Sequence, residues 1–131
     1  MANVTIPIKR QNYKLAGESA NQYNGFEPNV ISGALTGEYI TSSDTITIPA
    51  DFKDHKTVFV IVNADSAAKT VTFKAGNSYA GVKDLAVSAA VGTNIIWLDS
   101  APFVNKKTGV ITVTTDEATA SKLSVFGYEM R

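Results

Sequence analysis

From residue 45 to the end of the chain, short apolar and β-branched runs alternate with clusters of Gly, Asn, Asp and Ser. This punctuation is typical of strands, and no segment keeps a 3.6-residue hydrophobic period over the roughly 10 to 12 residues that a helix requires. The runs recur at close to the spacing of sandwiches and barrels. We therefore predict an all-β fold, a single β-sandwich or small barrel of about seven strands in residues 45–131, with the strands at 45–49, 57–63, 69–74, 85–88, 93–99, 109–115 and 121–130.

Two neighbouring runs differ in pattern. TVFVIVN (57–63) is apolar on both faces, which indicates a strand covered on both sides, whereas KTVTFK (69–74) alternates and turns Val71 and Phe73 inward. We expect these two strands to pair through the connection ADSAA. Trp97 lies in NIIWLD between apolar neighbours, so we expect its ring to pack in the core.

Residues 1–44 form a different region, rich in Asn, Gly, Ser, Glu and Tyr and only weakly periodic. Its first 14 residues carry three basic residues and no acid, and residues 15–44 carry four acids and no base. Long segments without secondary structure rarely persist as idle loops. We predict an extended N-terminal arm that contacts a partner; the alternative is a strand or loop packed on the protein's own sandwich.

The bulk composition narrows the classes of partner. Twelve basic and twelve acidic residues give a formal net charge of zero, so no global field attracts nucleic acid or an anionic membrane. The chain has no cysteine, which excludes disulfides and thiolate zinc sites. Neither a signal-peptide h-region nor a membrane-spanning apolar stretch is present. We expect a soluble protein made in the cytoplasm that binds neither nucleic acid nor membrane.

Two glycines five apart, Gly76 and Gly81, raise the question of a phosphate-binding loop. A P-loop requires Lys directly after the second Gly, followed by Ser or Thr, and a helix after that. Here Val82 follows Gly81, Lys83 comes one place late, and Asp84 stands close to where the hydroxyl should be. We interpret the segment as a turn between two strands, with the glycines supplying positive-φ positions.

Other candidate chemistry is equally weak. His55, the only histidine, lies in the charged connection DFKDHKT, where a solvated turn residue is the ordinary explanation. Asp51, Asp54 and His55 lack the ligand spacing of a metal site. Asp116-Glu117 sits in what we expect to be a hairpin turn, and a glycosidase needs two converging carboxylates. We predict that the protein is not an enzyme and has no catalytic residue, cofactor or metal.

A series of short elements runs through residues 57–115, and its members are Val62-Asn63, Val71-Thr72, Ala75-Gly76, Gly81, Asp84-Leu85, Val87, Gly92, Ile96, Leu98, Phe103, Gly109-Val110 and Thr112-Val113. In this series the chain resembles the small structural proteins of tailed bacteriophages, particularly head decoration (cement) proteins. The resemblance implies a β-sandwich or barrel bound to the outer face of an assembled capsid, where it braces neighbouring subunits and catalyses no reaction.

The implied partner is the major capsid protein, with self-association as a homo-oligomer such as a trimer left open, and the implied location is the capsid surface of the virion. The alternative function is a carbohydrate- or surface-binding β-sandwich module of a phage tail or fibre, centred on exposed aromatics such as Tyr79. Tyrosine gives a large contact area at low entropic cost when a partner orders it. The candidate capsid-contacting residues are Lys9, Arg10, Tyr13, Lys14, Tyr23, Phe26 and Tyr39.

Overall fold

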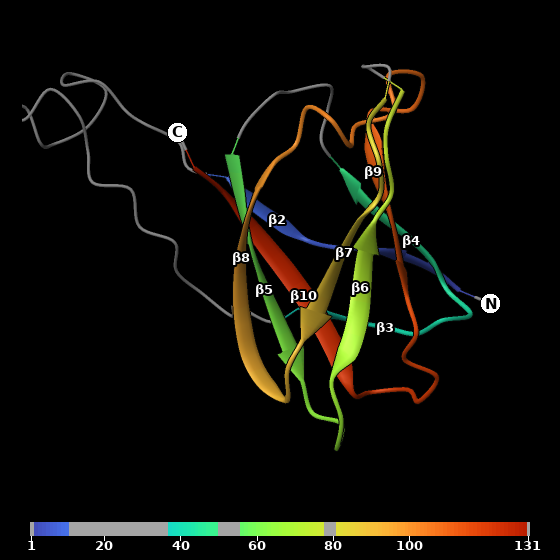
Figure 1. The fold of residues 1–131 in the computed structure, drawn as a ribbon, viewed down its shortest axis with the longest axis vertical. Helices are drawn as coiled ribbons and strands as arrows, with labels where there is room; N and C mark the ends of the chain where they lie inside the picture. Colours follow the sequence, from blue (N-terminus) through green and yellow to red (C-terminus); the bar gives the residue numbers. More distant parts are fainter. Residues whose placement is uncertain (1, 11–36, 50–55, 78–80, 131) are drawn as a thin grey trace, which may run out of the picture.

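The computed structural model describes residues 2–10, 37–49, 56–77 and 81–130. In these residues the protein is a sandwich of two β-sheets with ten strands and no helix, which confirms the predicted fold class (Figure 1). The strands are β1 (Asn3–Thr5), β2 (Ile8–Arg10), β3 (Glu38–Ile40), β4 (Thr45–Pro49), β5 (Lys56–Asn63), β6 (Lys69–Phe73), β7 (Leu85–Ala89), β8 (Gly92–Asp99), β9 (Val110–Thr115) and β10 (Leu123–Met130).

The strands divide into two sheets that mix distant parts of the chain. Sheet A has the order β1-β4-β9-β6-β7, and sheet B has the order β2-β10-β5-β8. One edge of β10 pairs with β5 along its whole length. Its other edge is shared, because β2 runs parallel to residues 127–129 while β3 runs antiparallel to residues 123–125.

The seven strands predicted in residues 45–131 are β4 to β10, and every boundary falls within two residues of the expected one. The predicted pairing of 57–63 with 69–74 is wrong, because β5 belongs to sheet B and β6 to sheet A. Asn63 explains the difference. Its buried side chain donates to the carbonyl oxygens of Ala67 (2.9 Å) and Ala89 (3.0 Å) and accepts from the N–H of Asp65 (2.9 Å), which directs the connection across the sandwich.

The core lies between the sheets and is built from alternate residues of each strand. Phe59 of β5 and Phe73 of β6 meet across it, with ring centroids 5.3 Å apart. The predicted inward positions Val71 and Phe73 are both fully buried. The other members of the buried cluster are Ile6, Ile40, Ile46, Ile48, Ile61, Ala89, Leu98, Val104, Ile111, Val113, Leu123 and Val125.

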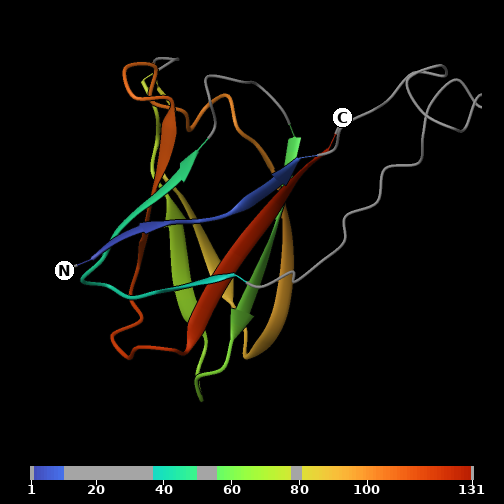
Figure 2. The same cartoon turned by 180° about the vertical axis from the view of Figure 1, so that it is seen from behind.

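Residues 2–10 tie the two sheets together. β1 pairs parallel with β4 of sheet A, and β2 pairs parallel with β10 of sheet B, so the segment crosses one side of the sandwich (Figure 2). Between them Ile6 is fully buried and its N–H donates to the carbonyl of Thr47 (2.9 Å), while the carbonyl of Pro7 accepts from the N–H of Gly127 (2.9 Å). The three N-terminal strands therefore pack on the protein's own sandwich. Residues 11–36, the rest of the predicted arm, lie outside the described residues.

Candidate contact surface

The outer face of sheet B is apolar across three strands. Strand register places Tyr128, Val58 and Trp97 in one row across β10, β5 and β8. The next row is formed by Phe126, Val60 and Ile95. Directly opposed residues of antiparallel strands point to the same side of a sheet, so these six side chains share the face turned away from the core.

Exposure differs sharply across this face. Val58 is buried, with 2% of its surface exposed, because it lies between Tyr128 and Trp97. Trp97 is 62% exposed and Ile95 is 64% exposed, both on β8. Tyr39, on β3 opposite Ser124, is 54% exposed. We call the six residues of these two rows, together with Tyr39, the apolar face.

The prediction that Trp97 packs in the core is wrong. Ile96 packs against the core and Leu98 is buried in it, so Trp97 between them must point outward in a strand. The four central residues of NIIWLD are all apolar, but alternate members of the run belong to opposite faces of the sheet. Exposed large apolar side chains clustered on one face mark an interaction site more often than isolated ones do.

Three of the predicted contact residues lie along one edge of β10. Lys9 and Arg10 are in β2, in register with Tyr128 and Glu129, and Tyr39 is in β3 further along the same edge. The structure therefore brings Lys9, Arg10 and Tyr39 to one border of the apolar face. The other four predicted contact residues, Tyr13, Lys14, Tyr23 and Phe26, lie outside the described residues, as do Asp51, Asp54, His55 and Tyr79.

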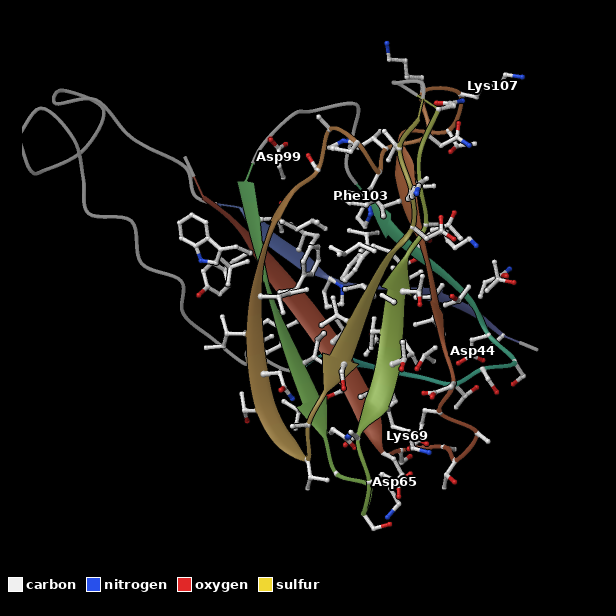
Figure 3. All side chains as sticks on the ribbon, in the orientation of Figure 1. Asp44, Asp65, Lys69, Asp99, Phe103 and Lys107 are labelled. Carbon is white, nitrogen blue, oxygen red and sulfur yellow. The ribbon has the colours of Figure 1, made fainter. Side chains whose placement is uncertain are left out.

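A buried carboxyl group that the sequence did not suggest lies at one end of the sandwich. Glu117 is fully buried, and its Oε2 lies 3.3 Å from Nζ of Lys69. The same Nζ lies 3.8 Å from Oδ2 of Asp65, and Figure 3 labels both Lys69 and Asp65. Apart from Lys69 and Asp65, the carboxyl oxygens of Glu117 have no hydrogen-bond partner among the described residues. The cluster joins the connection after β5 to the connection after β9.

The charges of this cluster shift one another. A side-chain hydrogen bond with Glu117, followed by the hydrogen bond from the N–H of Ser66 and by the charge of Lys69, holds the pKa of Asp65 below its usual value. The hydrogen bond and the charge of Glu117 raise the pKa of Lys69, and the charges of Asp65 and Asp116 raise it further. Each shift favours the charged form of the group, so the ion pairs contribute to holding the two connections together.

The pair Asp116-Glu117 has a structural role. Asp116 accepts a hydrogen bond from the N–H of Thr70 (2.9 Å), and the hydroxyl of Thr115 donates to the carbonyl of Thr70 (2.8 Å). The predicted hairpin turn is wrong, because β9 lies in sheet A and β10 in sheet B. The connection crosses between the sheets, which carries Glu117 into the interior.

The stretch with two glycines joins two paired strands, as predicted. β6 and β7 pair antiparallel up to Phe73 and Leu85. Asp84 closes the connection by accepting from the N–H of Ala75 and from Nζ of Lys74, both at 2.7 Å. These two contacts, in that order, lower the pKa of Asp84. Gly81 has the positive φ expected of it, at 80°.

Gly76 does not have the positive φ predicted for it. A Cβ atom added there would lie 2.3 Å from the carbonyl oxygen of Val104, and its N–H donates to the carbonyl of Pro102 (2.9 Å). Glycine is thus required by the close approach of the segment that follows β8.

The described residues bring no three His, Cys, Asp or Glu side chains close enough to share a metal ion. Among the described segments, none forms a helix with the length and apolar character needed to cross a membrane. In comparisons with known proteins, the chain matches no family model, no curated protein and no solved structure.

Proposed function

We propose that the protein is a virion structural protein that decorates the outer surface of a capsid and stabilises contacts between major capsid subunits. The observation that supports this most is the apolar face. On it Tyr39, Ile95 and Trp97 expose more than half of their surface, and the neighbouring side chains on the same face are valine and aromatic. The likeness of residues 57–115 to decoration proteins points the same way.

The physical basis of such a function is binding without chemistry. A protein that binds an assembled lattice but not its free subunits stabilises the lattice by mass action. Aromatic side chains supply much of the energy of such contacts because they bury a large area with few rotatable bonds. Tyr39 provides an exposed aromatic side chain for a shell surface, and β2, which carries Lys9 and Arg10, lies along the same edge of β10.

The structure determines which variants can test this function. Removal of residues 1–14 takes away β1, β2 and the buried Ile6, so loss of binding would report on folding. Substitution of Tyr39 by Ala keeps the fold intact because the side chain is exposed. We expect Tyr39→Ala to reduce co-sedimentation with decoration-free shells of the cognate phage by at least about tenfold in affinity, as for an aromatic hot spot.

Val91→Ala is the matched control, since Val91 is 57% exposed but lies outside the apolar face. It should sediment with shells as the unmodified protein does. Binding of the unmodified protein with no effect of Tyr39→Ala would remove Tyr39 from the contact, and failure of the unmodified protein to bind would contradict the proposed function.

The alternative, a carbohydrate-binding module, is favoured by one observation. Trp97 and Tyr39 present exposed aromatic rings on a sheet face, and such rings stack well on sugar rings. Saccharide binding measured by calorimetry and lost in Trp97→Ala would support this alternative over capsid decoration.

A further inference from the structure

Strand β7 forms one border of sheet A. Its five residues pair antiparallel with β6, from Leu85 opposite Phe73 to Ala89 opposite Lys69. Among the strands that the structure describes, no other one pairs with β7. In a border strand the N–H and C=O groups of every second residue bond to the neighbouring strand, and those of the residues between face outward.

The hydrogen bonds of β6 show which residues of β7 face outward. The N–H of Lys74, directly after β6, donates to the carbonyl of Thr112 in β9 (2.9 Å). Even-numbered residues of β6 therefore bond to β9, which leaves the odd-numbered ones to bond to β7. Because odd-numbered residues of β6 lie opposite odd-numbered residues of β7, the backbone groups of Ala86 and Ser88 face outward.

One outward position just beyond β7 is already filled by a side chain. Asn94 holds the backbone of Ala90, with its Oδ1 accepting from the N–H (3.2 Å) and its Nδ2 donating to the carbonyl (2.8 Å). This amide takes the place that a neighbouring strand would take. No described strand does the same at Ala86 and Ser88, and both residues are exposed.

We propose that β7 pairs antiparallel with β7 of a second copy of this chain, around a two-fold axis that passes beside Val87. In this register Ala86 of each copy lies opposite Ser88 of the other, and each pair exchanges both of its N–H···O=C bonds. The strand is complementary to itself, because the two-fold rotation exchanges its two outward residues. The interface is isologous and joins two copies of sheet A into one sheet. This inference does not depend on a capsid.

The composition of β7 favours a second copy as the partner. The strand contains no charged residue that would repel its own copy, no Pro and no bulge, so the usual protections of a sheet edge are missing. In the proposed register Val87 lies opposite Val87 of the other copy. Leu85, which is 38% exposed, lies opposite Ala89, so the exposed apolar surface beside the edge becomes covered.

The expected size of the interface sets its strength. A strand of five residues is about 17 Å long, and a strip of that length and about 15 to 20 Å wide covers on the order of 300 Å² per copy. This is well below the roughly 800 Å² per partner of a standard stable complex. We therefore expect a reversible dimer with a dissociation constant on the order of 100 µM.

Disulfide cross-linking tests the register, because the chain has no cysteine of its own. In the proposed pair the Cα atoms of Ala86 and Ser88 lie about 5.5 Å apart, a distance that a disulfide spans. Oxidation of a mixture of the Ala86→Cys and Ser88→Cys variants should give a covalent dimer with one chain of each. Either variant alone should give much less, because identical positions are offset by about 7 Å along the strands.

Amide hydrogen exchange tests the backbone bonds in the unmodified protein. The N–H groups of Ala86 and Ser88 should exchange rapidly in dilute solution and severalfold more slowly above the dissociation constant. Those of Leu85 and Val87, which bond to β6, should be protected at both concentrations.

Sedimentation equilibrium tests the strength of the association. The mass should rise from one chain towards two around about 100 µM. Ser88→Pro removes an outward N–H and keeps the bonds of β7 to β6, so it should raise the dissociation constant at least about tenfold. Ser88→Ala is the matched control, because it keeps the N–H, and it should leave the constant within about twofold.

Circular dichroism establishes that each variant is folded, and the exchange and cross-linking measurements decide the matter if Ser88→Pro does not fold. A monomer at every concentration would overturn the proposal and leave this edge to a strand of another protein. A trimer, undiminished association of folded Ser88→Pro, or equal cross-linking of either cysteine variant alone would also overturn it.

Discussion

Nζ of Lys69 lies 3.3 Å from Oε2 of Glu117, a residue with no exposed surface. This pair joins the start of β6 to the connection that follows β9, at one end of the sandwich. Lys69 itself keeps about a quarter of its side-chain surface in contact with solvent, which allows the buried carboxylate to be neutralised by a partly hydrated cation.

Removal of the lysine alone should destabilise the protein more than removal of both charges. Lys69→Met leaves a buried carboxylate without its cation, whereas Lys69→Met with Glu117→Leu replaces the pair by apolar groups. We expect the urea midpoint to fall clearly in the single variant and to recover at least half of the loss in the double variant. An additive effect of the two substitutions would contradict this account.

Stability should fall on the acidic side because of Asp65 and Asp84. The folded state lowers the pKa of both groups, so their contribution is present above the unfolded value of about 3.9 and is lost as the pH falls through the folded pKa. We expect the urea midpoint of the unmodified protein to drop between about pH 5 and pH 2. Asp84→Asn, which cannot ionise, should flatten part of that drop.

The raised pKa of Lys69 acts on the alkaline side. Its contribution is complete below the unfolded value of about 10.4 and is lost as the pH rises through the folded pKa. Lys69→Met should remove this alkaline loss while leaving the contribution of Asp84 at low pH in place.

Substitution of Ile6 by Ala tests whether the N-terminal segment belongs to the fold. Ile6 is fully buried between β1 and β2, and such a truncation costs about 2 to 5 kcal/mol in the free energy of unfolding. Val4→Ala, at a half-buried position, should cost less. Unchanged stability of Ile6→Ala in urea denaturation would mean that residues 2–10 do not pack on the sandwich in solution.

Two glycine substitutions should separate crowding from backbone conformation. Gly76→Ala places a Cβ against the carbonyl of Val104 and should cost about 1 to 3 kcal/mol, the range of overpacking. Gly81→Ala has open space around the new atom, and its φ of 80° alone should cost about 1 kcal/mol. Equal effects in thermal denaturation would argue against the close approach at Gly76.

Tryptophan fluorescence should report the exposure of Trp97. The chain has a single tryptophan, and 62% of its surface is exposed. In dilute solution we expect emission typical of a hydrated indole and efficient quenching by iodide. Emission typical of a buried indole, together with weak quenching, would contradict the placement of Trp97 on the outer face.

The strands of residues 45–131 could be predicted because their signals are local. Alternation and turn residues identify β4 to β10, and Val71 and Phe73 were assigned to the correct face. Strand pairing is a non-local property. The side chain of Asn63 bonds to the carbonyl of Ala89 in another strand, and the sequence ADSAA does not predict this contact or the passage of the chain into the second sheet.

The contact surface was harder to predict for the same reason. Trp97 stands in an apolar run, and only the period of two, fixed by the buried Leu98, reveals that it points outward. The local sequence around Glu117 is typical of a turn. The lysine that pairs with the buried Glu117 is Lys69, 48 positions away, and the local sequence gives no sign of it. The predicted contact role of Lys9, Arg10 and Tyr39 stays a prediction.

The placement of β2 against residues 127–129 bears on the order of events during synthesis. Strand β2 finds its partner in sheet B only after residues 127–129 have been translated. Until then Ile6 and the inner side of β5 have no closed interior to occupy, so closure of the sandwich is a late, long-range step. Strand β2 must therefore stay unaggregated while β3 to β10 are synthesised.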